Sequence, residues 1–596
     1  MAAASTLIPI YHPLDTKQKE IRIATIVPNP DITAPIEVNL EVVSLFLPGQ
    51  YAALSYCWAS LEGTRDIILC GHKTSVTKNL WEALRQFRSE RVPIRIWMDA
   101  VCINQDDVME RSSQVGLMRD VYSMATAVLV WLGPATRQTE IAFGFLNFIM
   151  SFDSVDVSLD EMPGEFNTAA HFLALGEIFR NVYWRRRWTT QETHVARSMS
   201  IHCGTFSIGP YSNLNGCWLR HVTQYTDSCQ AIARRHLGGG NTLYKTVLAE
   251  TSAVSSALIV YVDPIRAENP SHLNGFFRTE ASVAHDYVYG LLGLLPEDIG
   301  IIPSYSLSVG EVFADFAFRF MKQFGMIQLL HLANHNASDI PSWAPDFRHQ
   351  MLASVPMLPG DSNKGSGATE IPGYKIRLLG SHESLYNASA GSSCGVRSRT
   401  GDVLAVSGLV VDRIIALGDV MNDPVDSRGD LVQTFKLLAG WQDLYQKLSQ
   451  EGALDNQAVR YDNHFQFMMD FVFTVCADIS QDFNDPHRPW RRCPRAEFEE
   501  YMLGLFWEPS SYPEGITWED MKLRLTWIDL LAARNTFFIT SSGRMGLAPG
   551  EIRVGDHICI LAGMRMPVRL RGVQAEGQSR FTYHEPVYVQ GELHND

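Results

Sequence analysis

The sequence predicts an α/β fold in its first third, followed by a mainly α-helical region and a small C-terminal β unit. Three observations support this organisation. Short apolar runs alternate with helical periodicities between residues 21 and 133, which is typical of layered strands and helices. Apolar helical faces dominate residues 205–350. Short strand patterns separated by glycine turns, including one at Gly555-Asp556, follow from residue 537 onwards.

Three apolar runs in the first third are typical of buried strands: residues 51–58, 94–103 and 128–133. Residues 77–88, between the first two runs, place three apolar side chains at helical spacing: Leu80, Leu84 and Phe87. A second helical pattern follows an expected N-cap at Asn104 or Asp106 and repeats at Val115, Met118, Tyr122 and Ala125. Strands that alternate with helices in this way predict a parallel sheet.

Composition shifts divide the remainder of the chain. Residues 356–370 and 387–401 are rich in glycine, serine and, in the first stretch, proline, and they lack periodicity, which is typical of loops or linkers. The predicted regions are an α/β domain at 1–205 with its motifs in 51–192, a mainly helical region at 206–355, a loop or linker at 356–402, a mixed, mainly helical region at 403–530, and a small β unit at 531–596.

Charge and composition exclude several classes of protein. The chain has 596 residues, of which 46% are hydrophobic and 19% charged, so it can bury more than one core. Its formal net charge is −15, and the dense basic runs at 185–187 and 491–492 are short. A duplex nucleic-acid binder needs an extended basic face, so nucleic acid is not an expected partner.

Cysteine usage and hydropathy indicate a reducing compartment. The ten cysteines form no C-x-x-C pair and no secreted framework, so free thiols are expected rather than zinc or disulfides. The N-terminal stretch lacks a basic region before its apolar residues, and no apolar run reaches the roughly 18 residues that a transmembrane helix needs. We therefore expect a cytoplasmic protein without a membrane span.

Several common site motifs do not occur in the sequence. It contains no phosphate-binding P-loop, no G-x-G-x-x-G loop and no H-E-x-x-H pair. These absences exclude most nucleotide-cofactor and metalloenzyme classes, and no metal site is predicted. Three dense clusters of unusual residues in the first third remain.

The first cluster lies at the end of a predicted strand and contains Ser55, Tyr56 and Trp58. In an open parallel sheet the carboxyl ends of the strands face the ligand crevice, so polar side chains there are placed to bind a ligand. An amphipathic strand whose aromatic rings fill the edge of the sheet explains the same residues equally well.

The second cluster contains Asp99, at the end of the next strand, followed by Asn104 and Gln105. A helix cap explains Asn104 completely, whereas Asp99 follows an apolar run and must find hydrogen-bond donors, for which Arg186 or backbone amides are candidates. Glu110 and Arg111 are better explained as surface residues or as pairing residues between elements than as catalytic residues.

The third cluster, residues 186–192, places a carboxylate where the core is expected. If the stretch forms a helix, Glu192 shares a stripe with Trp188 and Val195. A salt bridge to Arg186 or Arg187, or a boundary position that reaches water, would explain it. The functional alternative is a carboxylate held in a crevice beside aromatic rings, suited to binding ribose hydroxyls or stabilising a sugar-like cation.

In this order, the three clusters resemble the fungal heterokaryon incompatibility (HET) domain family. That family carries Y-x-A-L-S-Y-x-W-G, then a block from W-I-D-x-x-C-I-N-Q to W-L-G, then R-x-W-x-x-Q-E, which stand here at residues 51–59, 97–133 and 186–192. The middle block matches at Trp97, Asp99, Cys102, Ile103, Asn104, Gln105, Asp107, Glu110, Arg111, Gln114, Val115, Met118, Tyr122 and Ala125.

The resemblance extends to segments on both sides of these blocks, at residues 11–23, 286–294, 340–347 and 546–563. It therefore covers nearly the full length of the chain. Two departures stand out. Ala59 replaces the usual glycine of the first block, and residues 284–294 lack the arginine and lysine of the usual D-x-R-D-K-V-Y.

The resemblance implies a role in fungal nonself recognition, in which fusion of incompatible cells triggers programmed cell death. HET domains are distantly similar to TIR domains, flavodoxin-like α/β modules, several of which cleave NAD with a glutamate four residues after a tryptophan. Trp188 and Glu192 have that spacing. The implied catalytic residue is Glu192, and the implied substrate-binding residues are Ser55, Tyr56, Trp58, Asp99, Asn104, Gln105, Arg186, Trp188 and Gln191.

NAD is thus a candidate substrate, and no certain cofactor is implied. Protein partners of the incompatibility system and self-association are the implied interactions. Two alternatives remain open: a non-enzymatic signalling or assembly module, and an accessory protein or enzyme of a secondary-metabolite pathway.

Overall fold

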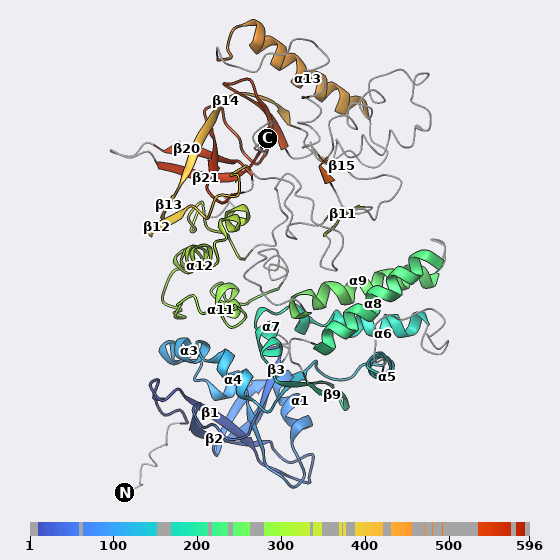
Figure 1. Ribbon diagram of the computed structural model, residues 1–596. Helices are drawn as coiled ribbons and strands as arrows, with labels where there is room; N and C mark the ends of the chain where they lie inside the picture. Colours follow the sequence, from blue (N-terminus) through green and yellow to red (C-terminus); the bar gives the residue numbers. More distant parts are fainter. Residues whose placement is uncertain are drawn as a thin grey trace. The chain divides into compact units, whose positions relative to one another are not determined.

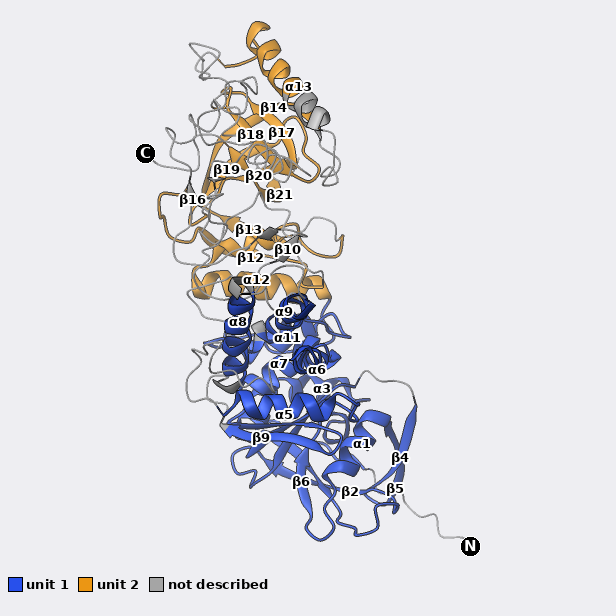
Figure 2. Cartoon of the chain, turned by 90° about the vertical axis from the view of Figure 1, so that its right-hand side faces the viewer, with its two compact units in different colours: residues 1–266, 275–308 blue, residues 267–274, 309–596 orange. Residues whose placement is uncertain are grey.

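The structure is a computed structural model of the chain in which the described residues fall into two compact units (Figure 2). Unit 1 comprises residues 1–266 and 275–308, and unit 2 comprises residues 267–274 and 309–596. The described residues are 10–58, 63–151, 168–212, 217–236, 242–262, 279–333, 338–348, 369–371, 374–376, 388–420, 431–455, 470, 479–480, 491–492, 535–564, 566–573 and 580–589.

Unit 1 contains a nine-stranded mixed sheet in the order β5-β4-β2-β1-β6-β3-β7-β8-β9 (Figure 1). Its strands are β1 (Glu20–Ile26), β2 (Glu37–Ser44), β3 (Ala52–Tyr56), β4 (Thr64–Leu69), β5 (His72–Thr77), β6 (Ile94–Trp97), β7 (Ala127–Trp131), β8 (Ser198–Cys203) and β9 (Phe206–Ser212).

Four neighbouring strands, β6-β3-β7-β8, are parallel to one another. Numbered along the chain, their order is 2-1-3-4, which is the start of the flavodoxin-like order 2-1-3-4-5. The predicted α/β class with a parallel sheet is confirmed. The chain leaves β3 towards β6 on one side and returns to β7 on the other, so the topological switch point lies between β3 and β7.

Helices surround this sheet, and several of them pack against one another. Their bounds are α1 (Lys78–Phe87), α2 (Asp99–Cys102), α3 (Val108–Val115), α4 (Met118–Met124), α5 (Thr139–Ile149), α6 (Ala169–Phe179), α7 (Arg187–His194), α8 (Cys217–His236), α9 (Thr242–Val262) and α11 (Asp286–Leu292), with a 3-10 helix η2 (Val182–Arg185). Helices α5, α6, α8 and α9 pack against one another in a helical layer, of which α8 and α9 are drawn in green in Figure 1.

The predicted element boundaries in unit 1 need three corrections. The apolar run 94–103 is a strand only to Trp97, because the chain turns into helix α2 at Asp99. The helix after it begins later than predicted, since the carboxylate of Asp107 accepts the amides of Met109 and Glu110 and is the true N-cap. The side chain of Asn104 instead accepts the Asp106 amide in a local turn.

The helical pattern from Val115 to Ala125 spans two helices, α3 and α4, which Gly116 and Leu117 separate. Strands β4 and β5 form a hairpin that the sequence analysis did not predict. Its two-residue loop, Cys70-Gly71, has positive φ at both positions (50° and 82°), as a type I′ turn requires.

Unit 2 is built on a seven-stranded antiparallel sheet in the order β21-β20-β19-β14-β17-β18-β22. The sheet closes on itself, because β21 and β22 are consecutive in the chain yet lie at opposite ends of this order. These strands are β14 (Gly408–Val420), β17 (Asn535–Thr540), β18 (Met545–Pro549), β19 (His557–Leu561), β20 (Val568–Val573), β21 (Arg580–Pro586) and β22 (Tyr588–Val589).

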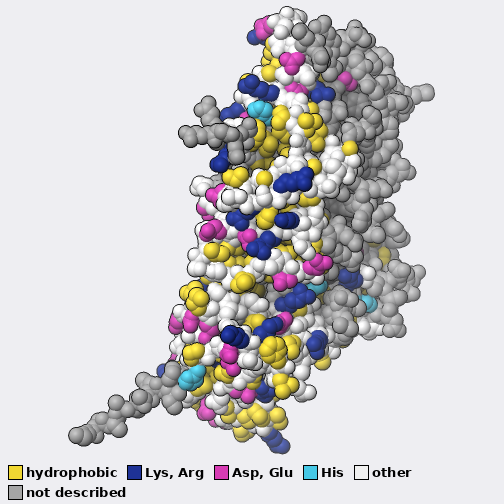
Figure 3. Space-filling model, turned by 60° about the vertical axis from the view of Figure 1, so that its left-hand side comes forward, with side chains coloured by type: hydrophobic (Ala, Val, Ile, Leu, Met, Phe, Trp, Pro, Cys, Tyr) yellow, Lys and Arg dark blue, Asp and Glu magenta, His cyan; other side chains and the backbone are white. Residues whose placement is uncertain are grey.

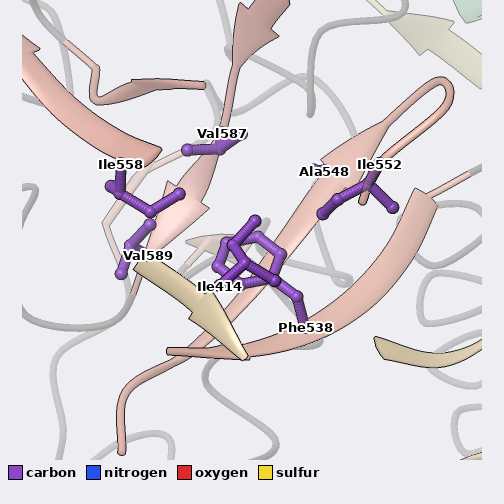
Figure 4. Packing of buried hydrophobic residues seen from close by; sticks show 7 residues of the cluster. All are labelled: Ile414, Phe538, Ala548, Ile552, Ile558, Val587 and Val589. Atoms are coloured by element: carbon purple, nitrogen blue, oxygen red, sulfur yellow. The ribbon is translucent and has the colours of Figure 1, made fainter. Parts of the chain in front are cut away.

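A compact apolar cluster fills the interior of this closed sheet (Figure 4). It consists of Ile414, Phe538, Ala548, Ile552, Ile558, Val587 and Val589. The predicted turn at Gly555 is confirmed, with φ of 99° between β18 and β19. The C-terminal antiparallel sheet is therefore confirmed, and β14 contributes to it from the segment before residue 531.

The other elements of unit 2 precede or interrupt this sheet. They are α12 (Val309–Phe324), a 3-10 helix η4 (Ile327–Leu332), β10 (Thr369–Ile371), β11 (Tyr374–Ile376), β12 (Val396–Thr400), β13 (Val403–Val406), α13 (Leu431–Gln450), β15 (Ile479–Ser480) and β16 (Arg491–Arg492). The predicted linker spans residues 356–402. Its part before residue 388 lies outside the described residues, except for 369–371 and 374–376.

Surface and hydropathy features are unremarkable in the described part of the chain. On the face shown in Figure 3, basic and acidic side chains are interspersed along the described surface rather than gathered by sign. None of the described helices is long and apolar enough to cross a membrane. Seven cysteines are free thiols: Cys57, Cys70, Cys102, Cys203, Cys229, Cys394 and Cys559.

Candidate functional site

The candidate site lies at the carboxyl end of β3, beside the switch point between β3 and β7. Ser55, near the end of β3, is fully buried and pairs in register with Val130 of β7. Tyr56, Cys57 and Trp58 follow it at the edge where open α/β sheets bind their ligands. The first cluster therefore stands where the sequence predicted it.

Glu192 points from helix α7 onto this strand end. Its Oε2 accepts a hydrogen bond from Ser55 Oγ at 2.5 Å, and Ser55 Oγ also lies 2.6 Å from the hydroxyl of Tyr183. The Glu192 side chain is buried, with 4% of the residue exposed. The carboxyl is thus held by a buried serine rather than by an arginine of its own helix.

Helix α7 owes its position to tertiary contacts. Three of its eight residues are threonines, which are weak helix formers, and its N-cap residue, Arg186, gives no side-chain cap. The hydroxyl of Thr189 bonds the carbonyls of Tyr183 and Arg186, each at 2.9 Å, and so joins α7 to the preceding 3-10 helix. Such a short helix depends on its packing, so its neighbours decide where Glu192 lies.

Asp99 forms the second carboxyl of the site. It follows β6 as the first residue of α2, and both of its oxygens accept the Trp58 indole Nε1, at 3.0 and 2.9 Å. The Ala100 amide donates to Oδ1 at 2.8 Å, and Gln105 Nε2 donates to the Asp99 backbone carbonyl at 2.9 Å. Asp99 therefore joins the first two sequence clusters.

Arg186 supplies a positive charge to both carboxyls. The charge of its guanidinium lowers the pKa of Glu192 and of Asp99, and it also opposes the rise in the pKa of the Cys57 thiol that burial causes. Arg187, the other candidate partner of Glu192, instead lies over the ring of Tyr287, 5.3 Å from its centroid. The three charged groups Asp99, Arg186 and Glu192 form what we call the carboxyl cluster.

The carboxyl cluster holds two acids and one base, and this imbalance sets its protonation. Burial, and then the charge of Asp99, raises the pKa of Glu192 to about 8 against the opposing effects of Ser55 and Arg186. Burial likewise raises the pKa of Asp99, although the Trp58 hydrogen bond and Arg186 oppose it. Both acids therefore hold a proton more tightly than an isolated carboxyl would, and ionisation of one opposes ionisation of the other.

Tyrosine hydroxyls enclose the cluster. Burial raises the pKa of Tyr56, Tyr122 and Tyr183 well above its ordinary value, so all three stay protonated donors. Tyr122 donates to the Leu54 carbonyl at 3.0 Å. The buried Tyr56 hydroxyl makes no hydrogen bond of regular geometry, although it lies close enough to Asp99 to influence its pKa.

Three of the predicted binding residues have side chains that lie against other parts of the unit. The side chain of Gln191 accepts the Gly293 amide at 3.2 Å, and Trp188 lies close enough to Asp286 to lower the pKa of that carboxyl, so both face α11. Asn104 lies in the loop before α3, where its backbone amide donates to Glu110 at 2.7 Å and its side chain accepts the Asp106 amide. Their assignment as substrate-binding residues stays a prediction.

Glu110 is a pairing residue, as its sequence context indicated. Its carboxylate binds both terminal nitrogens of the buried Arg22, at 2.5 and 2.9 Å. This ion pair joins α3 to β1. The other hydrogen bonds that Arg22 and Glu110 make within the described residues do not involve the carboxyl cluster.

Sequence reasoning missed Tyr183, Cys57 and Asn79. Asn79, in the first turn of α1, donates to the Cys57 carbonyl at 2.8 Å and accepts the Trp131 indole at 2.9 Å, so it ties the ends of β3 and β7 together. No motif marks it. The sequence predicts no nucleophile elbow, and the G-x-S-x-G pattern at 391–395 leads into strand β12 rather than a helix, so it does not form one.

Comparison with known proteins supports the motif assignment. Residues 51–192 match the family described as heterokaryon incompatibility protein (HET). The chain is also 22% identical over 649 aligned positions to heterokaryon incompatibility protein 6, OR allele, of Neurospora crassa, covering 91% of this chain and 89% of that protein. No solved structure matches the chain. The resemblance predicted from the three sequence blocks is confirmed.

Proposed function

The chain carries a HET domain over residues 51–192, and we propose that it acts in heterokaryon incompatibility as an effector whose HET domain cleaves NAD and thereby promotes cell death. The role in incompatibility rests on the family match and on the full-length similarity to heterokaryon incompatibility protein 6. The proposed chemistry rests on the carboxyl cluster.

One observation carries the chemical part of the proposal. Glu192 accepts a hydrogen bond from Ser55, which lies at the end of a central parallel strand. A second carboxyl, Asp99, and the cation Arg186 lie close enough to Glu192 to shift its pKa. Once both acids ionise, this group carries a net negative charge in a region of low dielectric constant. Such a charge stabilises a developing ribosyl cation and suits the cationic nicotinamide ring.

The reaction divides into two bond changes. The bond from ribose C1′ to the nicotinamide nitrogen breaks, and its electron pair leaves with the nitrogen, which neutralises the pyridinium ring. Ionised Glu192 stabilises the resulting oxocarbenium ion. Water then bonds to C1′ and gives its proton to the Glu192 carboxylate, which leaves ADP-ribose and nicotinamide as products.

This mechanism predicts how the activity depends on pH. Glu192 must be ionised, and its pKa is raised to about 8 by burial and by Asp99. The rate therefore rises with pH and levels off above about 8. Since only 4% of Glu192 is exposed, NAD reaches it after a local rearrangement, so assays should include protein clustered on a multivalent scaffold.

The test is NAD consumption by the full chain, free and clustered, between pH 6 and 9. Glu192→Gln should reduce kcat by about a hundredfold or more, because it keeps the shape and removes the charge. Glu250→Gln is a matched control, since Glu250 is similarly buried but pairs with Arg180 at 2.5 Å elsewhere in unit 1. Absence of NAD turnover by clustered wild-type protein at every pH would refute the proposed chemistry.

A second candidate function, a non-enzymatic assembly module, is favoured by the start of α3. Met109 is 79% exposed, and its neighbour Val108 is also exposed, so two large apolar side chains stand next to each other on the surface. Glu110 does not contribute charge to this surface because it is buried against Arg22. Met109→Glu should then abolish death signalling in cells while Glu192→Gln leaves it intact; the NAD proposal predicts the reverse.

A further inference from the structure

Residues 279–308 belong to unit 1 although they follow the HET-domain match at 51–192 by more than eighty positions. The segment joins the site at its first described residues. The Arg187 amide donates to the Glu280 carbonyl at 2.9 Å, and the Glu280 amide donates to the Arg185 carbonyl at 2.5 Å. These bonds flank Arg186, so the segment is attached directly at the start of α7.

Helix α11 of this segment packs closely against α7. Gln191 accepts the Gly293 amide, and a Cβ on Gly293 would lie 2.4 Å from the Gln191 amide carbon. A Cβ on Gly290 would lie 2.6 Å from Cγ of Arg187. Two glycines therefore allow close packing, and α7 contacts both β3 and α11.

Asp286 makes a second polar contact of this interface. Its carboxyl is buried, accepts a hydrogen bond from the Tyr305 hydroxyl at 2.7 Å, and lies close enough to the Trp188 side chain for that group to lower its pKa. Trp188 precedes Glu192 by one helical turn. Burial raises the pKa of Asp286, against the effects of these donors and of the charges of His285 and Arg111. A change at Asp286 therefore acts on the helix that carries Glu192.

The same segment also contacts the two helices that follow Asp99 in the chain. The Arg111 guanidinium of α3 lies over the Tyr305 ring, 4.5 Å from its centroid, and Arg119 of α4 donates to the Leu295 carbonyl at 3.2 Å. Just before α3, Gln105 donates to the Asp99 backbone carbonyl. Residues 286–305 thus contact α7, which supplies Glu192, and the helices α3 and α4, which follow the loop that binds the Asp99 backbone.

We propose that residues 279–308 complete the functional HET domain of this chain, and that Asp286 is a positioning residue that holds Glu192 at its place beside Asp99. The segment, rather than the matched residues alone, fixes the geometry of the carboxyl cluster. The expected effect on kcat rests on the proposed NAD cleavage. The expected effect on the position and titration of Glu192 does not.

The experiment uses the full chain with Asp286→Asn, which keeps the shape but gives up one acceptor oxygen, and with Tyr305→Phe, which removes a single donor. The first readout is kcat and KM for NAD. The second is the titration midpoint of Glu192, from pH-difference infrared spectra in which Glu192→Gln identifies the band. Glu250→Gln again serves as the matched buried-carboxylate control.

We expect kcat to fall by about ten- to a hundredfold in Asp286→Asn with little change in KM, because displacement by about an ångström has effects of this size. The Glu192 midpoint should move from about 8 towards its ordinary value as α7 loosens from Asp99. Tyr305→Phe should shift both in the same direction by less, and Glu250→Gln should shift neither.

The outcomes separate the two proposals. If the wild-type chain cleaves no NAD but the Glu192 midpoint moves in both variants, the positioning role stands and the NAD chemistry falls. If both variants leave the midpoint and kcat unchanged while they lower stability as much as Glu250→Gln does, Asp286 is only structural and the positioning role is overturned.

Discussion

Two buried carboxylates, one in each unit, have opposite ionisation behaviour. Glu192 in unit 1 shares one cation with Asp99, and burial with that second acid raises its pKa to about 8. Asp556 in unit 2 is just as buried, but it accepts Arg569 at 2.8 Å and Arg571 at 2.7 and 2.8 Å. Burial alone would raise the pKa of Asp556, and the hydrogen bonds from Arg571 and Arg569 lower it to about 2.

The difference teaches how to separate a structural carboxylate from a functional candidate. Asp556 is ionised at any physiological pH, and its partners join the turn before β19 to β20. Glu192 keeps a proton that it can lose near neutral pH, and such perturbed groups in a polar cluster are typical of functional sites. The ratio of cations to carboxylates, rather than the depth of burial, decides between the two.

The largest expected effect is the loss of Asp556. Asp556→Ala removes the carboxylate that Arg571 and the fully buried Arg569 share and leaves Arg569 with Glu585 as its remaining partner, which should lower the free energy of unfolding of unit 2 by about 3 kcal/mol. Hydrogen exchange of peptides from β19 and β20 in denaturant measures this. Glu551→Gln, which removes an exposed partner of Arg553, is the control and should change less than about 1 kcal/mol. Equal effects of the two changes would contradict the comparison.

A second effect concerns the sign of the pH dependence. The folded state holds the Glu192 proton more tightly than the unfolded state, so this group's contribution to stability falls as pH rises between about 4.5 and 8, by at most about 1.4 kcal/mol per pH unit. Asp556 does the opposite: its contribution is present above about 3.8 and is lost as pH falls towards 2.

Glu192→Gln should therefore gain stability relative to wild type as pH rises from 5 to 8, as measured by urea unfolding at each pH. Glutamine resembles the protonated acid and has no charge to bury. A stability difference between the two proteins that does not vary with pH would show that Glu192 titrates normally.

The smallest expected effect is that of Ser55→Ala. The serine hydroxyl lowers the pKa of Glu192, so its loss should raise that pKa further and reduce stability by about 1–3 kcal/mol. Infrared titration and urea unfolding measure the two changes. Ser200→Ala is the matched control, because this buried serine of β8 bonds His202 at 2.7 Å and not a carboxyl. A Glu192 pKa that moves equally in both variants would argue against the Ser55 contact.

Local sequence patterns were sufficient for much of unit 1. The apolar runs at β3 and β7 and the helical spacing of α1 predicted strands and a helix close to their actual bounds, and the run at β6 predicted where that strand begins. Strand ends in a parallel sheet share one edge, so placing Ser55 and Asp99 near each other followed from period and order alone. The hairpin β4–β5 was not predicted, because its residues are largely polar and exposed and therefore show no regular alternation of apolar side chains.

The sequence by itself determined the resemblance of residues 51–192 to the HET family, the parallel α/β layer and the stripe position of Glu192, because motifs and periodicities are local properties of the chain. Only the tertiary structure decided which groups meet that carboxyl. Ser55, Tyr183 and Asp99 come from three separate elements, and α11 returns from nearly a hundred residues beyond Glu192 to hold α7. The energy of a buried charge depends on neighbours within a few ångströms, and those neighbours are fixed by packing rather than by spacing along the chain.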